Sequence, residues 1–283
     1  MPAAVRALRP HQWAKNLLVF VAAVAAHVHL TAALGGRLGL AFFAFSFLAS
    51  AGYLLNDLAD LPHDRDHPQK RLRPIAAGEL SRSAAMTLAG ALAGAAAVLA
   101  AALPPRFDAV LAGYLTLTIA YSLALKRFAI LDVITLATLY TARVAAGALV
   151  VDAPLSQHFV AFSIFIFLSL ALAKRVVELR DSPSTGRGYA TTDVPVLTAL
   201  GLGCAVASAL VYVMYATGAD ATRYYRHPPL LLAGLPVFLY WISRVWLLSG
   251  RGAMTDDPLV FALRDPLSYM TLGALLLIVF LAT

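Results

Sequence analysis

The sequence has few charged residues and a single cysteine, and both shortages restrict what it can be. Only 13% of its 283 residues are Asp, Glu, Lys or Arg, whereas 60% are hydrophobic. A soluble domain has roughly 25% charged residues, so these few charges cannot cover a water-soluble surface, and disorder, collagen and coiled coil are excluded as well. Because Cys204 has no second cysteine, an intrachain disulfide and a Cys-based metal site are also excluded. A membrane protein with several spans remains.

Long apolar stretches occupy most of the chain. A spanning helix needs about 20 apolar residues, and an open strand cannot cross lipid because its edge amides would stay unpaired. We therefore expect an all-α polytopic membrane protein, a single domain over residues 1–283 with nine transmembrane helices. The expected spans are residues 17–34, 38–56, 83–103, 108–125, 130–150, 158–173, 194–216, 229–249 and 266–282.

Basic residues are unevenly distributed between the expected loops. With the N-terminus in the cytoplasm, 17 of the 22 Lys and Arg residues fall in cytoplasmic segments, four in outer loops and one, Arg143, inside a span. Because basic loops stay on the cytoplasmic side, this predicts a cytoplasmic N-terminus and an outer C-terminus. The cytoplasmic loops are expected near 57–82, 174–193 and 250–265. Most acidic residues lie on the same side, which this rule does not explain and which predicts a cytoplasmic active site.

The densest group of carboxylates lies where the second expected span ends. Asp57, Asp60 and Asp64 fall within about 60° of one another on a helix of 3.6 residues per turn. Carboxylates this close repel each other unless a cation lies between them, and oxygen ligands suit Mg²⁺, so the spacing indicates a Mg²⁺ site. Pro62 predicts a kink or a new helix start between Asp60 and Asp64. A solvated loop of mixed charge is the alternative interpretation.

Three basic residues, Lys70, Arg71 and Arg73, follow this cluster. We expect them to hold phosphate oxygens, since an arginine can donate two parallel hydrogen bonds to a phosphate and a lysine supplies a point charge. A carboxylate-bound Mg²⁺ beside such cations is typical of sites that bind a diphosphate. The region therefore predicts a phosphate-binding site.

The spacing Asn56-Asp57-x-x-Asp60-x-x-x-Asp64 is similar to the NDxxDxxxD motif of the UbiA superfamily of intramembrane prenyltransferases. The continuation through Arg65, His67-Pro68, Lys70 and Arg73-Pro74 resembles one branch of it, the polyprenyl-phosphate phosphoribosyltransferases. Further similar strings are Arg9-Pro10-x-Gln12-Trp13-x-Lys15-Asn16, Tyr121-Ser122-x-x-Leu125-Lys126, Lys174-Arg175-x-x-Glu178-Leu179 and Met254-Thr255-Asp256-Asp257-Pro258. The resemblance thus extends over essentially the whole chain.

This resemblance implies an enzyme of the bacterial inner membrane, with a UbiA-like helix bundle around a central cavity that opens to the cytoplasm. The implied reaction is Mg²⁺-dependent transfer of the 5-phosphoribosyl group from phosphoribosyl diphosphate to a polyprenyl phosphate of the decaprenyl type. Diphosphate is released, and the product serves cell-envelope polysaccharide synthesis. Asp57, Asp60 and Asp64 are the implied catalytic residues and metal ligands. The implied partners are the two substrates and the bilayer, and no nucleic acid is implied. The resemblance leaves open whether the chain forms a homo-oligomer.

The region after the sixth expected span departs from the family pattern. Most members carry a second motif made of aspartates there, whereas this chain has Lys174, Arg175 and Glu178. The extra phosphates of a phosphoribosyl donor and a lipid phosphate call for cations rather than more carboxylates, so the departure favours ribosyl transfer. The alternative is an ordinary Lys–Glu pair four residues apart on a helix.

Arg143 lies near the middle of the fifth expected span. A charged side chain costs at least roughly 2.5–3.5 kcal/mol at this depth, so we expect Arg143 to face the bundle interior and contact phosphate or a carboxylate. A helix-packing arginine is the alternative. The complete set of substrate-binding residues that we predict is Lys15, Asn56, Arg65, Lys70, Arg73, Lys126, Arg143, Lys174, Arg175, Glu178 and Tyr189.

The stretch Asp256-Asp257-Pro258 has two interpretations. An acidic N-cap followed by proline at the first helical position is the one we favour. A gating loop over the cavity is the alternative.

Two other functions fit parts of the sequence. An aromatic prenyltransferase, which moves a prenyl group from prenyl diphosphate to an aromatic acceptor, would use the same first motif because it also releases a metal-bound diphosphate. A transporter for an anionic solute would account for Arg143 in a span. The sequence has no visible inverted repeat or paired broken helices that would favour the transporter.

Overall fold

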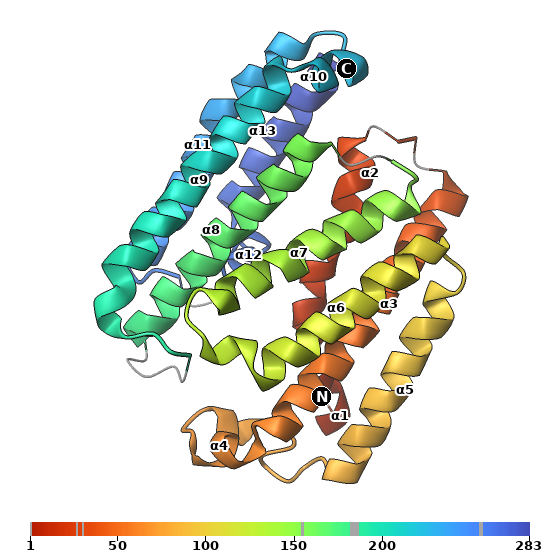
Figure 1. Cartoon of the computed structure of the whole chain (residues 1–283), viewed down its shortest axis with the longest axis vertical. Helices are drawn as coiled ribbons and strands as arrows, with labels where there is room; N and C mark the ends of the chain where they lie inside the picture. The colour runs from red at the N-terminus through yellow and green to blue at the C-terminus, as the bar shows by residue number, and fades with distance from the viewer. Residues whose placement is uncertain (1, 27, 30, 154–155, 182–186, 255–256) are drawn as a thin grey trace. The chain divides into compact units, whose positions relative to one another are not determined.

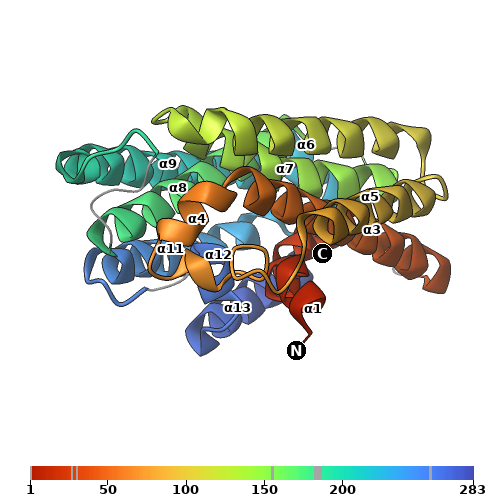
Figure 2. The same ribbon diagram turned by 90° about the horizontal axis from the view of Figure 1, so that it is seen from below.

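The computed structural model describes residues 2–26, 28–29, 31–153, 156–181, 187–254 and 257–283. These residues form helices joined by short connections, and no β-strand occurs among them (Figure 1 and, turned by 90°, Figure 2). The all-α prediction is therefore confirmed. Residues 182–186 and 255–256, which belong to two of the predicted cytoplasmic loops, lie outside the described residues, and so does Asp256.

Six helices of the described part are long and apolar enough to cross a membrane. They are built on α3 (Ala32–Ala59), α5 (Arg82–Ala100), α7 (Leu131–Val150), α8 (Gln157–Asp181), α9 (Val194–Thr217) and α11 (Gly234–Gly250). The predicted spans 108–125 and 266–282 coincide with α6 (Pro105–Leu123) and with α13 (Pro266–Ala282), which is a shorter apolar helix. A count of nine spanning helices stays a prediction.

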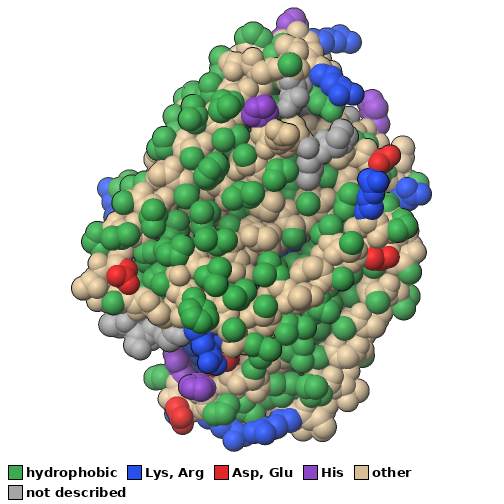
Figure 3. Space-filling model, viewed as in Figure 1, with side chains coloured by type: hydrophobic (Ala, Val, Ile, Leu, Met, Phe, Trp, Pro, Cys, Tyr) green, Lys and Arg blue, Asp and Glu red, His purple; other side chains and the backbone are tan. Residues whose placement is uncertain are grey.

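Many large apolar side chains on these helices remain exposed. Val98, Val206, Leu210 and Phe280 are among the most exposed of them. Figure 3 shows hydrophobic side chains over most of the viewed face, with charged side chains in a few small groups. Exposed apolar surface on this scale is unfavourable in water and is what lipid chains cover, so the protein is an integral membrane protein.

The first predicted span, residues 17–34, is not a single helix. The chain here forms a 3₁₀ helix, η1 (Pro10–Phe20), followed by the short α2 (Val21–Ala25). The next helix, α3, begins already at Ala32, because the Thr31 hydroxyl accepts a hydrogen bond from the backbone amide three residues on and caps it. The boundary that we predicted between the first two spans is therefore wrong.

Short helices connect the long ones. They are α1 (Ala3–Leu8), α4 (Leu61–Asp66), η2 (Lys70–Leu72), η3 (Leu125–Arg127), η4 (Thr191–Asp193), α10 (Ala219–Tyr224), η5 (Pro228–Ala233) and α12 (Pro258–Ala262). The chain divides into two compact units, one of residues 1–126 and 142–154, the other of residues 127–141 and 155–283. The single domain over residues 1–283 stays a prediction.

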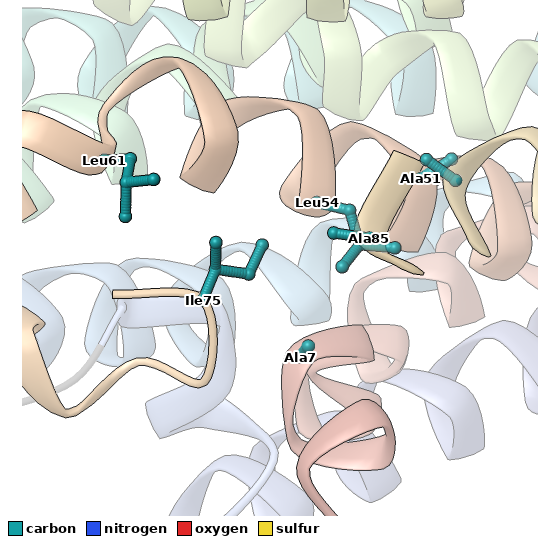
Figure 4. Close-up of a cluster of buried hydrophobic side chains, with 7 residues drawn as sticks. Ala7, Ala51, Leu54, Leu61, Ile75 and Ala85 are labelled. Carbon is teal, nitrogen blue, oxygen red and sulfur yellow. The ribbon is translucent and has the colours of Figure 1, made fainter. Parts of the chain in front are cut away.

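In the first unit, α3 packs against η1, α1, α5 and α6. A core of mostly small side chains joins α1, α3 and α5 to the segment after α4, as Figure 4 shows. In this core Leu61, at the start of α4, and Ile75 point toward one another. The contact holds the α3–α4 junction against the segment that carries Arg73.

A glycine allows the part of α7 in the first unit to approach η1 closely. A Cβ atom at Gly147 would clash with the backbone carbonyl of Val19, so no larger residue fits without a shift of the chain. Small residues at such a contact let two helices pack tightly. The approach fixes η1, which carries Lys15 and Asn16.

In the second unit, α8 packs against α9, α11 and α12. A chain of hydrogen bonds joins three of its helices: Trp246 Nε1 donates to Ser169 Oγ at 2.9 Å, and Ser169 Oγ donates to the Gly201 carbonyl at 2.8 Å. The helix α12 begins at Pro258, and the Asp257 carboxylate caps it by accepting from the Leu259 amide at 3.1 Å. The predicted N-cap is confirmed.

Candidate active site

Two arginines hold Asp57, which lies in the last turn of α3. Arg9 Nη2 donates to both of its carboxylate oxygens, at 2.6 and 2.8 Å, and Arg73 Nη1 donates to Oδ1 at 3.1 Å. Asp57 is buried, and burial of a carboxylate is tolerated only when its charge is compensated. Arg9 has left-handed backbone angles, and its guanidinium lies 5.1 Å from the centroid of the Tyr53 ring. Arg9 thus belongs to the site, although we did not predict it.

The carboxylates of Asp57 and Asp64 share one cation. Arg73 Nη1, already bonded to Asp57, also donates to Asp64 Oδ2 at 2.6 Å. One nitrogen atom therefore bridges two carboxylates that lie seven residues apart in the sequence. The structure thus brings Asp57 and Asp64, two of the predicted metal ligands, close together. The positive charge that lies between them is the guanidinium of Arg73.

Asp60 lies at the junction of α3 and α4 and has a different partner. Lys126 Nζ lies 2.9 and 2.7 Å from its two carboxylate oxygens and 3.0 Å from Asn56 Oδ1. Asn56 Nδ2 in turn donates to Asp60 Oδ2 at 3.1 Å. Since α3 ends at Ala59 and α4 begins at Leu61, the helix break that Pro62 predicts is confirmed.

No group of three or more His, Cys, Asp or Glu side chains in the described part of the chain is arranged to hold a metal ion. The donors nevertheless fit Mg²⁺ chemically, because Asp57 in the last turn of α3, Asp60 at the α3–α4 junction and Asp64 in α4 all offer hard carboxylate oxygens. Basic side chains pair with all three carboxylates. These residues would bind a divalent cation only after the basic groups move.

Arg143 faces the interior of the first unit, as expected from its depth in a span, and is 5% exposed. Its Nε donates to Asn16 Oδ1 at 2.7 Å and its Nη2 donates to Tyr114 Oη at 2.7 Å. Asn16 Nδ2 continues the network by donating to Ser46 Oγ at 3.0 Å. These partners are neutral groups of η1, α6 and α3, so the contacts join helices, as the packing alternative describes.

The other predicted residues of the first unit lie at different depths. Lys15 is buried in η1, Lys70 is half-buried in η2, and Arg65 is exposed on α4. Their roles in substrate binding stay predictions.

A fully buried ion pair forms the centre of the second unit's polar cluster. Arg175 Nε donates to Asp132 Oδ2 at 2.6 Å, and both side chains are 0% exposed. Arg175 also pairs with Glu178, which lies 3.8 Å from Arg187 Nε. The structure therefore pairs Glu178 with an arginine three residues earlier, whereas the alternative interpretation of this stretch paired it with Lys174.

Tyr189 connects the loop after α8 to the start of α7. Its hydroxyl donates to Asp132 and accepts from the Ile130 amide, with a donor–acceptor distance of 2.7 Å for the second bond. Burial and the neighbouring Asp132 carboxylate raise the pKa of the Tyr189 phenol above its ordinary value. The phenol is therefore a neutral hydrogen-bond donor at physiological pH.

Lys174 lies one residue before Arg175 and has a separate, more exposed partner. Its Nζ lies 2.8 Å from Asp257 Oδ2, and the Tyr140 hydroxyl lies 3.4 Å from the same oxygen. These three side chains line a small cavity together with Leu136, Leu170, Ala171 and Leu259. Lys174 is thus a partly exposed, ion-paired cation beside mostly apolar side chains.

The predicted set lacks several residues of these clusters, among them Arg9, Asp132 and Asp257. Asp132 carries a sequence signal, a carboxylate at the start of an apolar span. Arg9 belongs to the string Arg9-Pro10-x-Gln12-Trp13 that resembles the family, but no local pattern shows that it, and not Arg6, reaches the motif, and Arg6 pairs with Glu79 at the surface.

Three proteins of known sequence resemble the chain over much of its length. Uncharacterized protein y4nM of Sinorhizobium fredii is 39% identical over 279 residues, which are 95% of this chain and 53% of that protein. Nodulation protein NoeC of Azorhizobium caulinodans is 34% identical, over 97% of this chain and 92% of that protein. Decaprenyl-phosphate phosphoribosyltransferase of Mycolicibacterium smegmatis is 39% identical over 186 residues, 64% of this chain and 58% of that protein. The chain thus spans about half the length of two of these relatives.

The fold is similar to that of a UbiA homolog from Archaeoglobus fulgidus bound to GPP and Mg²⁺. The TM-score is 0.75, with 15% identity, and the match covers 98% of this chain and 99% of that one. The sequence model of the UbiA prenyltransferase family matches residues 16–282. The chain therefore belongs to the UbiA prenyltransferase family and has the fold of an intramembrane enzyme.

Proposed function

We propose that this protein transfers the 5-phosphoribosyl group from phosphoribosyl diphosphate to a polyprenyl phosphate of the decaprenyl type and releases diphosphate. The observation that carries the proposal is the pairing of every carboxylate of the Asn56–Asp64 motif with Arg or Lys. The 39% identity to a decaprenyl-phosphate phosphoribosyltransferase over 186 residues supports it further.

The proposal follows from the charges of the substrates. The donor carries a diphosphate and a 5-phosphate, and the acceptor carries another phosphate, so the protein must compensate many negative charges. Arg73 and Lys126 in the first unit, and Lys174 in the second, are partly exposed cations that can bind phosphate oxygens.

In the proposed reaction, an anionic oxygen of the lipid phosphate forms a bond to C1 of the ribose while the bond from C1 to the diphosphate oxygen breaks. The bonding pair leaves with the diphosphate. Mg²⁺, when held by Asp57, Asp60 and Asp64, supplies charge neutralisation for the leaving group. Arg73 and Lys126 bind the diphosphate and orient it. Because the attacking oxygen is already ionised at pH 7, no general base is required.

The proposal includes the topology. The basic residues of the loops support a cytoplasmic N-terminus, an outer C-terminus and a reaction on the cytoplasmic side of the bacterial inner membrane. The partners are phosphoribosyl diphosphate, polyprenyl phosphate and the bilayer.

The test uses the full chain in lipid nanodiscs with Mg²⁺, ribose-labelled phosphoribosyl diphosphate and decaprenyl phosphate. We expect label to enter the organic extract only when both substrates and Mg²⁺ are present. A parallel reaction supplies a prenyl diphosphate and an aromatic acid. Consumption of the prenyl diphosphate without transfer of ribose label would replace our proposal with aromatic prenyl transfer.

A further inference from the structure

The basic side chains of the first unit's cluster occupy the carboxylate oxygens that a divalent cation would need. Arg73 Nη1 is within 3.1 Å of an Asp57 oxygen and 2.6 Å of an Asp64 oxygen, and Lys126 Nζ contacts both oxygens of Asp60. A metal ion and these basic groups therefore compete for the same oxygen atoms.

These two cations differ from the third one, Arg9, in how they are held. Arg73 and Lys126 have side chains that are 25% and 14% exposed, and Lys126 pairs with Asp60, which is 29% exposed. Arg9 instead donates to both oxygens of the buried Asp57 and stacks near Tyr53. The side chain of Arg9 is itself 23% exposed, so exposure does not distinguish it from Arg73. The difference is that Arg9 donates to one buried carboxylate and lies against Tyr53, whereas Arg73 divides its bonds between two carboxylates and Lys126 pairs with the partly exposed Asp60. Arg73 and Lys126 are therefore the two cations that can change partners while Arg9 stays on Asp57.

We propose that Arg73 and Lys126 are exchangeable counter-ions that make divalent-cation binding depend on a diphosphate group. In the free protein they neutralise Asp57, Asp60 and Asp64. A diphosphate draws both cations away through stronger, charge-assisted hydrogen bonds, and the released carboxylates then bind the divalent cation. The inference rests on the proposed function, because it assigns the metal to these three carboxylates.

This exchange has a thermodynamic consequence. The metal alone must displace Arg73 and Lys126 without any compensating partner for them, and the diphosphate alone must compete with the carboxylates for the same cations. When both bind together, each cation and each carboxylate obtains a new partner. Binding of the two ligands is therefore positively coupled, and the coupling is the same whichever ligand binds first.

Two binding measurements on the full chain in nanodiscs test the inference without turnover. The first titrates Mn²⁺ alone and follows the free ion by electron paramagnetic resonance. The second measures retention of labelled inorganic diphosphate with Mg²⁺ and with EDTA. For the wild-type protein we expect weak Mn²⁺ binding, and diphosphate binding that is about tenfold tighter, or more, with Mg²⁺ than with EDTA.

The variants Arg73→Gln and Lys126→Gln remove one competing cation each. Both should bind Mn²⁺ alone about tenfold more tightly than wild type, and their diphosphate binding should respond less to Mg²⁺. Arg6→Gln is the matched control, because Arg6 pairs with Glu79 at the surface of the same unit, outside the motif. It should behave as wild type.

The outcomes are distinct. Tight Mn²⁺ binding by the wild-type protein without diphosphate, unchanged in both variants, would overturn the exchange. If Arg73→Gln fails to fold, Lys126→Gln still decides, because its pair with Asp60 is more exposed than the pair of Arg73 with Asp64. Coupled binding without ribose transfer would leave the exchange intact and refute the proposed function. Ribose transfer without coupling between Mg²⁺ and diphosphate binding would refute the exchange and leave the proposed function intact.

Discussion

The two polar clusters use the same kinds of side chain in opposite arrangements. In the first unit, three carboxylates come from one stretch at the end of α3, and their cations come from other segments. In the second unit, two adjacent cations come from α8, and Asp132 and Asp257 reach them from elsewhere. The Arg175–Asp132 pair is fully buried, whereas the cations Arg73 and Lys126 are partly exposed, although the Asp57 and Asp64 carboxylates that Arg73 holds are themselves buried.

We propose that this difference separates ion pairs that hold the fold from ion pairs that can open to bind a substrate. Removing one partner of a buried pair leaves an uncompensated charge in the interior, so such a pair cannot open during a reaction cycle. A partly exposed pair contributes little to stability and exchanges its partners at low cost. We therefore propose that Arg175, which we predicted as a substrate contact, stabilises the second unit, and that Lys174 is the cation there that binds phosphate.

The strongest test of this difference is Arg175→Leu. It should lower the free energy of unfolding by about 3–5 kcal/mol, because Asp132 would stay buried without its cation. Thermal unfolding in detergent measures the change. The control is Arg251→Leu, because Arg251 is an exposed residue directly after α11 and its loss should leave the stability close to that of wild type. A variant as stable as wild type would remove the distinction between the two clusters.

In the first unit the largest loss should be catalytic. We expect Asp60→Asn to lower ribose transfer by about 10²–10³-fold, because it removes a negative charge from the proposed metal site. The new amide can still form hydrogen bonds with Asn56 and Lys126, so the fold should be kept. The measurement is label in the lipid extract, with thermal unfolding alongside. Asp66→Asn, an exposed neighbour on α4, should retain activity. Near-normal transfer by Asp60→Asn would refute its role.

Lys174 is expected to behave like the first cluster even though it lies in the second unit. Lys174→Gln should raise the KM for phosphoribosyl diphosphate or for the lipid phosphate about tenfold, with thermal stability close to wild type, because its pair with Asp257 is partly exposed. Lys174→Glu should abolish transfer through repulsion of phosphate. If both variants keep normal kinetics, Lys174 serves only to hold Asp257.

The smallest effect concerns Asp265, which caps α13 and pairs with Arg244. Burial works against its ionised form, but hydrogen bonds from Arg244 and Ser268 prevail and hold the pKa of this carboxyl below its usual range. Because the pKa is lower in the folded state, the stabilisation is complete above the ordinary pKa, near 4, and is lost as the pH falls through the folded-state pKa.

Unfolding of wild type and Asp265→Asn measured between about pH 7 and pH 3 checks this. The variant should be less stable by about 1 kcal/mol at neutral pH, and the difference should shrink in acid. A constant difference across this range would show that the Asp265 charge is not involved.

Local sequence patterns predicted the parts of the site that depend on neighbouring residues. The spacing of Asp57 and Asp64 on one helical face predicted that they lie together, and Pro62 predicted the break between α3 and α4. Asp257 followed by Pro258 predicted the start of α12. Each of these features is set by helix geometry or capping within a few residues.

Features that depend on contacts between distant segments were not predictable in the same way. No sequence pattern shows that Arg9 pairs with Asp57, or that Lys174 pairs with Asp257 and not with Glu178 four residues later. Arg143 illustrates the limit: its depth predicted a buried position, but its contacts with Asn16 and Tyr114 depend on how η1 and α6 pack. The close approach of Gly147 to the backbone of Val19 in η1 is likewise a contact between distant segments.

A competition assay tests the proposed reaction most directly. The full chain receives ribose-labelled phosphoribosyl diphosphate and a differently labelled prenyl diphosphate together, with decaprenyl phosphate, an aromatic acid and Mg²⁺. Our account predicts ribose label in the lipid product, its loss in Asp60→Asn, and an unconsumed prenyl diphosphate. Prenyl label on the aromatic acid, with no ribose in the lipid, would contradict it.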